Sequence, residues 1–173
     1  VPVISPITMA QASMNDGQTL LAFNDLFIGA RSHVSARYRL QAGSQGEDQS
    51  SSGIIISTGA GSTGWLKSVY AGAAKVIEAL GGEVHPPSNG GQFPWDADRL
   101  IYAVREPWPS KSTGANLVYG VITRDQPLVI TSHMAENGVI FSDGIENDYL
   151  AFNAGRAATI RIADKKVNLV THT

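Results

Sequence analysis

The stretch Ile54–Trp65 reads IIISTGAGSTGW, and it decides which fold the rest of the chain can adopt. Its first residues, Ile54–Ser57, form a short apolar run that predicts a buried strand. The next residues, Thr58–Gly64, form a loop rich in glycine and hydroxyl groups. Apolar residues then recur at spacings of three and four over about 64–80, which predicts the principal helix. Gly81-Gly82 follows and predicts the end of that helix.

Two nucleotide-binding motifs can be tested against this stretch and fail. Gly59–Gly64 matches G-x-G-x-x-G between a predicted strand and a predicted helix. A dinucleotide-binding βαβ unit also requires a second parallel strand after the helix, but Gly81–Asp98 is full of Pro, Gly and polar residues. A Walker loop requires Lys after its last Gly, whereas Trp65 follows Gly64. The sequence therefore predicts neither motif.

Two other interpretations of the loop remain open. As a plain strand-to-helix turn it is well capped, and its N–H groups with the helix dipole suit a phosphate or the polar edge of a nucleotide. Alternatively, Ser62 lies in a nucleophile elbow, because Ala60 replaces the first Gly of G-x-S-x-G and Asp143 and His172 follow in the order Ser, Asp, His. A serine hydrolase is a remote alternative, since the chain after Leu100 has an antiparallel pattern.

Most of the remaining chain carries the alternation of a half-buried strand, which is clearest over Val34–Leu40. Further strands are predicted at Thr19–Ile28, Leu100–Val104, Leu117–Thr123, Leu128–Thr131, Val139–Phe141, Tyr149–Phe152, Thr159–Ile162 and Val167–Val170. Two segments lack any period: Ala42–Ser52 is interpreted as a mobile hairpin loop, and Glu83–Asp98 as a long crossing pinned by Phe93 and Trp95. The Pro-rich segment Arg105–Lys111 is expected to be a solvated loop that covers Trp108, and the alternative is a basic lip for a phosphorylated ligand. The prediction is a mainly β, sandwich-like fold with one helix.

Composition restricts the class of protein further. The chain has 173 residues, 13 basic and 15 acidic, no cysteine and only 16% charged residues. No block of like charge suggests a nucleic-acid partner, and no apolar run is long enough to suggest a membrane span. We expect one domain over residues 1–173, a cytoplasmic location, and self-association into a homo-oligomer that buries part of the weakly charged surface.

A set of motifs in a fixed order resembles the C-terminal domain of the NAD kinase family. The residues that carry the resemblance are Asn24-Asp25, the strand Gly53–Ser57, the loop Thr58–Trp65 with Ser68 one turn later, and Phe141–Gly144. It covers roughly Thr19 to Val170. The resemblance implies a β-rich sandwich that supplies much of a nucleotide pocket. A related branch, often described as sugar-kinase-like, is as close.

The resemblance also implies roles for individual residues. Asn24 and Asp25 would hydrogen-bond ribose hydroxyls, and Trp65 would stack on a base. The other residues implied to bind the nucleotide or sugar ligand are Thr58, Gly61, Ser62, Thr63, Gly64, Ser68 and Asp143.

The chain departs from the family pattern in ways that affect function. Ser52-Gly53 stands where the family has Asp-Gly, and the Gly-Gly-Asp-Gly-Thr motif of the family's N-terminal α/β domain does not occur. The resemblance therefore implies a fragment of a two-domain kinase that uses ATP and Mg²⁺, with no catalytic residue in this chain, which alone is expected to be inactive. The alternative is a non-catalytic nucleotide-binding or interaction module on the same fold.

Overall fold

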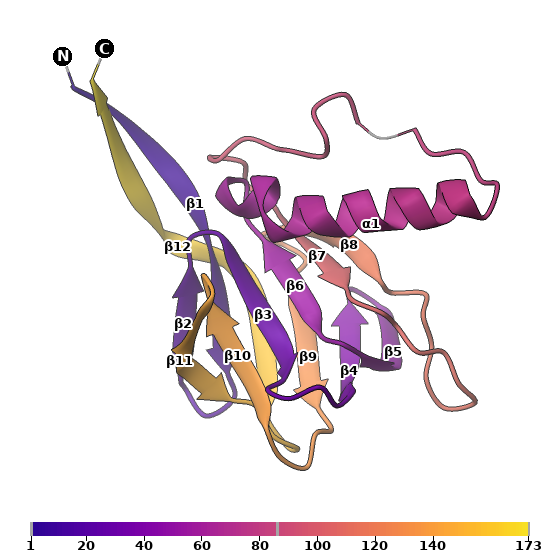
Figure 1. Cartoon of the computed structure of the whole chain (residues 1–173). Coiled ribbons are helices and arrows are strands. Elements are labelled where there is room, and N and C mark those ends of the chain that lie inside the picture. The colour runs from indigo at the N-terminus through magenta and orange to yellow at the C-terminus, as the bar shows by residue number, and fades with distance from the viewer. Residues whose placement is uncertain (1, 86, 173) are drawn as a thin grey trace.

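Twelve strands form two antiparallel sheets in the computed structural model, which describes residues 2–85 and 87–172 (Figure 1). The first sheet has the order β2-β1-β12-β9-β4-β5, and the second has the order β11-β10-β3-β6-β7-β8. The strands of the first sheet are β1 (Pro2–Met14), β2 (Thr19–Ala22), β4 (Ala36–Ala42), β5 (Gln45–Ser51), β9 (Leu128–Ser132) and β12 (Ala157–His172). Those of the second are β3 (Asp25–Ala30), β6 (Ile54–Ser57), β7 (Leu100–Val104), β8 (Tyr119–Ile122), β10 (Gly138–Ser142) and β11 (Ile145–Ala151).

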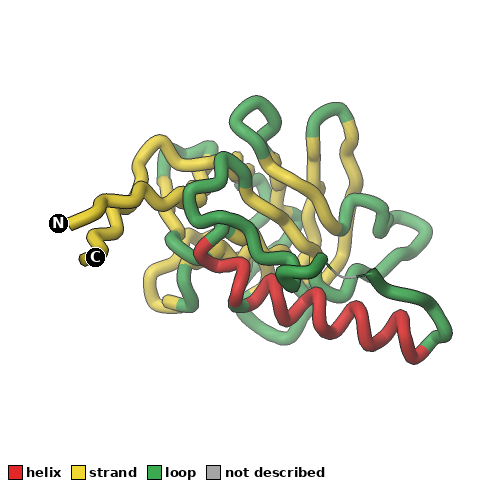
Figure 2. The backbone as a smooth tube through the Cα atoms, turned by 90° about the horizontal axis from the view of Figure 1, so that it is seen from above, coloured by secondary structure: helices red, strands yellow, loops and turns green. Residues whose placement is uncertain are grey.

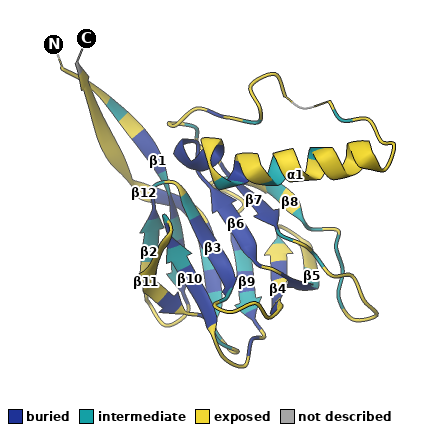
Figure 3. Cartoon of the chain, viewed as in Figure 1, coloured by how far each residue is buried: buried dark blue, intermediate teal, exposed yellow. Residues whose placement is uncertain are grey.

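The main hydrophobic core lies between the two sheets. Alternate residues of each strand point inward, as the two-residue period of a strand requires. Figure 3 shows that the strands in the middle of the two sheets are largely buried. The largest fully buried side chains of this core are Tyr38, Phe152, Leu26, Ile28, Leu40, Ile54, Ile56, Leu100, Ile122 and Leu128. The predicted mainly β fold with one α-helix is confirmed.

The helix α1 (Trp65–Ala79) lies on the outer face of the second sheet, and the 3₁₀ turn η1 (Ala60–Thr63) leads into it (Figures 1 and 2). Leu66 is its one fully buried residue, and it packs in a second core with Phe93, Ile101 and Ala103. This cover is the reason that β6 is buried on both faces and reads as a continuous apolar run. The predicted helix over about 64–80 is confirmed, and Gly81 ends it with φ of 82°.

Strands β1 and β12 continue past both neighbours as a two-stranded arm, with the two ends of the described chain side by side at its tip (Figure 1). Pairing runs from Pro2 with His172 to Thr8 with Lys166, whereas β2 pairs only with Ala10–Ser13. Apolar side chains remain exposed along the arm: Val3, Ile4, Val167, Leu169 and Val170. The arm therefore lacks the cover that an isolated pair of strands normally needs for stability.

Several sequence predictions about local structure are wrong. Ala42–Ser52 is not a mobile loop, because Gln45–Ser51 forms β5 and pairs along the whole of β4. Thr19–Ile28 is two strands interrupted at Phe23 and Asn24, and the two strands predicted within 159–170 are one continuous strand.

The predictions for the aromatic residues are partly confirmed and partly wrong. Phe93 is buried, as predicted, and Trp95 is 42% exposed with its ring edge-on to Phe23. Trp108 is 69% exposed, so the prediction that a loop covers it is wrong. No helix in the described part of the chain is long and apolar enough to cross a membrane.

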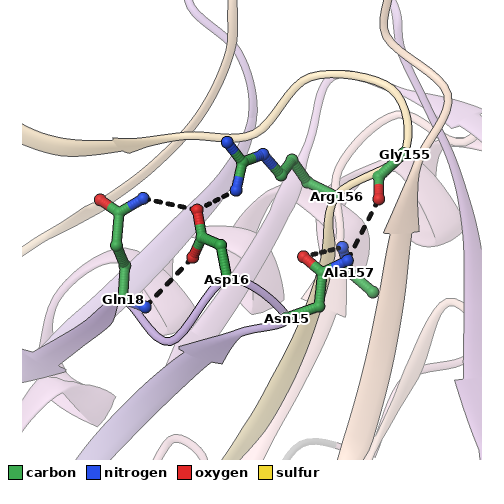
Figure 4. Close-up of polar contacts among 6 residues, drawn as sticks. All are labelled: Asn15, Asp16, Gln18, Gly155, Arg156 and Ala157. Carbon is green, nitrogen blue, oxygen red and sulfur yellow. Dashed lines mark hydrogen bonds and ion pairs between the residues drawn. The ribbon is translucent and has the colours of Figure 1, made fainter.

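A polar cluster joins the β1–β2 turn to the start of β12 (Figure 4). The Asn15 side chain donates to the Gly155 carbonyl (3.2 Å) and accepts from the Ala157 N–H (3.2 Å). Asp16 beside it accepts from Gln18 and from the guanidinium of Arg156. The cluster ties together residues about 140 positions apart, at the end of the sheet opposite the arm.

We expect Asn15→Ala to lower the free energy of unfolding by about 1 kcal/mol, because it removes both long-range side-chain bonds. Urea denaturation measures this change. Gln18→Ala is the control, since the Gln18 side chain bonds only to Asp16 in its own turn, and its effect should stay within about 0.5 kcal/mol. Equal effects of the two substitutions would contradict a stabilising role for the long-range bonds.

Candidate functional site

The break between β2 and β3 is held by one carboxylate from the turn after β10, the strand that pairs with β3. Asp143 lies in the β10–β11 turn and accepts hydrogen bonds from the backbone N–H groups of Phe23 (2.9 Å), Asn24 (2.6 Å) and Asp25 (3.3 Å). Asp143 and Gly144 both have positive φ (54° and 73°), as a tight hairpin turn requires. The turn thus fixes the backbone on which Asn24 and Asp25 stand.

The loop after β6 closes on the same break. The Thr58 hydroxyl lies 2.6 Å from the Phe23 carbonyl oxygen and 3.1 Å from that of Asn24, and it accepts the Gly61 N–H (3.2 Å). A Cβ placed on Gly61 would overlap with the backbone of Asn24. Glycine is therefore required here by close approach rather than by an unusual backbone angle.

A cavity of about 390 Å³ forms where these segments meet. Its lining is Asn24, Asp25, Ala60, Gly61, Thr63, Gly64, Trp65, Asp143 and Gly144. The structure thus brings together most of the residues singled out from the sequence, from three segments that are far apart along the chain. Ala60 and Gly144 were not among those predicted, although both lie inside the motifs that were recognised.

Thr58, Ser62 and Ser68 do not line this cavity. Thr58 and Ser62 are fully buried, and the Ser62 hydroxyl donates to the Gly59 carbonyl at 2.7 Å. A buried hydroxyl committed to the backbone cannot attack a substrate, which argues against the serine hydrolase alternative. Ser68 lines a neighbouring groove beside α1. These hydroxyls support the loop, and their orientation is not visible in a sequence pattern.

Three N–H groups of the loop are bonded within the loop itself and are not free to cradle a phosphate. The N–H of Gly61 bonds to Thr58, that of Ser62 to Gly59 (3.3 Å) and that of Gly64 to Gly61 (3.0 Å). Within the described residues, no Lys or Arg lines the cavity, whereas Asp25 and Asp143 do. The cavity therefore favours groups that donate hydrogen bonds, such as hydroxyls, over phosphates.

Asp25 is the electrostatically unusual residue of the site. Burial, followed by the nearby Asp143 carboxylate, raises the pKa of Asp25 to about 6. Its charged form is thus poorly solvated in the free protein and would gain from hydroxyl donors. A perturbed acid in a cavity is a typical feature of functional sites.

Trp65 also borders a second cavity, of about 420 Å³. Phe27 stacks on one face of the indole (5.6 Å between centroids, 7° between planes), and the guanidinium carbon of Arg105 lies 5.4 Å from the ring centre. Base stacking by Trp65 stays a prediction, restricted to the ring surface that Phe27 leaves free. Nothing in the sequence pattern pointed to Phe27, whereas Arg105 begins the segment whose alternative interpretation is a basic lip for a phosphorylated ligand.

Comparisons with known proteins bear on the fold. No protein-family model matches the sequence, and no curated protein matches it. Among solved structures, the chain is similar to an NAD kinase from Archaeoglobus fulgidus, whose crystal structure is in complex with ATP, with a TM-score of 0.60 and 16% identity. The fold is NAD-kinase-like. The match covers 96% of this chain but 54% of that kinase, so the chain spans about half of its neighbour's length.

The Mg²⁺ implied by the family resemblance does not fit this part of the protein. Over residues 2–85 and 87–172, no group of three or more acidic or histidine side chains could hold a metal ion. Asp25 and Asp143 are the two acids of the cavity, and the Asp143 oxygens already accept backbone hydrogen bonds. The described residues of this cavity offer hydrogen-bonding groups without a set of metal ligands.

Asp25→Asn should increase the free energy of unfolding at pH 7 by about 1 kcal/mol, a value reduced for the partial exposure of the group. The folded chain holds the Asp25 proton more tightly than the unfolded chain does, so this residue costs stability as pH rises through the range from about 4 to above 6. Urea denaturation at pH 4 and pH 7 tests this. The gain should vanish at pH 4, and a gain independent of pH would rule out the charge as its cause.

Gly61→Ala should lower the free energy of unfolding by about 2 kcal/mol, because the added methyl group overlaps with the Asn24 backbone. Thermal unfolding followed by circular dichroism measures the loss. Gly72→Ala in α1 is the matched control: a Cβ there meets open space, and the change should stabilise by about 0.5–1 kcal/mol. The close approach would be refuted by a Gly61→Ala variant as stable as the parent.

Proposed function

We propose that this chain is the acceptor-binding domain of an NAD-kinase-like or sugar-kinase-like phosphotransferase. It binds the neighbouring hydroxyls of a nucleotide ribose or of a sugar between Asn24 and Asp25. The single observation that carries this proposal is the cavity in which the carboxamide and carboxylate meet the Gly61–Trp65 loop, with acids and no cation on its wall. A carboxylate beside an amide matches a pair of vicinal hydroxyls, because each hydroxyl both donates and accepts.

The described chain supplies binding and orientation in this proposal, and no catalytic residue. Phosphoryl transfer requires donor phosphates, metal ions and an acceptor in line. ATP and Mg²⁺ would be held by a further α/β domain in a longer protein. The length of the structural neighbour agrees with such an arrangement. We infer that the further α/β domain packs against the β1–β12 arm of this chain, where its contacts would cover the exposed apolar side chains of the arm.

Titration of the ¹⁵N-labelled chain with NAD, adenosine, 2′,3′-dideoxyadenosine and glucose tests the proposal. If the acceptor is a nucleotide, we expect adenosine and NAD to shift the amide signals of Asn24, Asp25 and Gly61. If the acceptor is a sugar, we expect glucose to shift the same signals. Dideoxyadenosine lacks both ribose hydroxyls and should bind at least about tenfold more weakly, since a hydrogen bond to a charged group contributes about 1.5–3 kcal/mol. Whichever of the two ligand types binds more tightly assigns the branch.

Asp25→Asn should weaken that binding about tenfold at pH 7.5. Binding to the parent chain should also weaken as pH falls below about 6, where Asp25 takes up a proton. Asp164→Asn removes an exposed carboxylate on β12 and should change nothing. The proposal fails if dideoxyadenosine and adenosine bind equally well, or if no ligand binds at millimolar concentration. Absence of binding favours the alternative of a module without catalytic function, which is consistent with Ser52 in place of the family's Asp.

A further inference from the structure

A larger cavity, of about 740 Å³, lies between α1 and the crossing segment Pro87–Phe93. It is separate from the Asn24–Asp25 cavity, and the two share no lining residue. In Figure 1 the crossing segment runs back along the exposed side of α1. The volume of this cavity falls within the range of small-molecule sites.

The floor and walls of this cavity are aromatic and aliphatic. Phe93 and Ile101 are each 6% exposed and belong to the core beneath α1. Tyr70 and Tyr119 join their hydroxyls at 2.8 Å, with ring centroids 6.0 Å apart. Gly91 has φ of 82° and lies so close to the Tyr70 ring that a Cβ would overlap with it. The crossing segment is therefore packed on the helix, and the cavity exists before any ligand arrives.

The charge at this cavity is positive. The guanidinium carbon of Arg99 lies 5.2 Å from the centre of the Phe93 ring, and Lys67 projects from the first turn of α1. Among the described residues, neither cation has a hydrogen bond or an acidic partner within 4.0 Å. The one acid of the lining, Glu78, is already paired with Lys75 at 2.7 Å. An arginine stacked on an aromatic ring keeps its N–H groups free for a carboxylate.

We propose that this cavity binds a flat, mainly apolar molecule with a single anionic group, of the class of fused-ring or aryl carboxylates. The ring lies against Tyr70, Phe93 and Ile101, and the carboxylate pairs with Arg99 and Lys67. This site does not depend on the acceptor-binding proposal, because it uses none of the same residues.

The probe is naphthalene-2-carboxylate, titrated into the full ¹⁵N-labelled chain, with naphthalene-2-carboxamide as its neutral counterpart. We expect the acid to shift the amide signals of Gly91, Arg99 and Ile101. The amide should bind at least tenfold more weakly, and Lys67→Met with Arg99→Met should weaken binding of the acid by a similar factor. Lys111→Met, on a distant exposed loop, is the charge control.

Filling the cavity provides a second, independent test. Ala74→Trp places a large side chain in the cavity and should abolish binding, whereas Ala73→Trp points to the groove on the other flank of α1 and should leave binding intact. Circular dichroism is the check that both variants are folded. The proposal is overturned if acid and amide bind equally, if Ala74→Trp binds as the parent does, or if no binding occurs up to the solubility limit of the probe. Shifts confined to Asn24, Asp25 and Gly61 would also overturn it.

Discussion

The hydrogen bonds that Asp143 accepts from the residues between β2 and β3 determine how the segments of the candidate site are arranged. A strand interrupted beside a sheet leaves N–H groups without strand partners, and these groups need other acceptors. Asp143 satisfies them from the β10–β11 turn, and the Thr58 hydroxyl meets the carbonyl oxygens of the same residues. The candidate site therefore forms at the place where Asp143 compensates for the break between β2 and β3. Asp25 and Asp143 lie close together because Asp143 accepts the hydrogen bonds of the N–H groups at this break.

This constraint explains why the site favours hydroxyls. The N–H groups of Gly61, Ser62 and Gly64 hold the 3₁₀ turn together, and the cavity wall carries two acids and, among the described residues, no Lys or Arg. Among residues 2–85 and 87–172 the carboxylate of Asp25 has no such structural partner, and burial beside Asp143 leaves its charge poorly compensated. Proteins accept local costs of this kind at functional sites, where a ligand supplies the missing interactions.

The sequence predicted β6, β7 and β10 of the second sheet well, because they are short apolar runs between turn residues, and it predicted α1 from a clear helical spacing. It failed for β5, whose polar residues are held in place by specific bonds: Ser51 with Tyr38, and Glu47 with the amides of Asn116 and Leu117. Such bonds join residues distant in sequence and leave no local period. The site residues were found through the order of their motifs, but which hydroxyls face the cavity depends on packing that only coordinates reveal, as Thr58 and Ser62 illustrate.

The arm has a consequence for the order of the chain itself. Because Pro2 pairs with His172, a short linker can join the two ends of the described chain without altering any contact in the sandwich. The chain can then be opened instead at an exposed turn, such as that at Gly43 between β4 and β5. The architecture is thus compatible with circular permutation, and the direction in which the strands are threaded is separable from the packing that stabilises them.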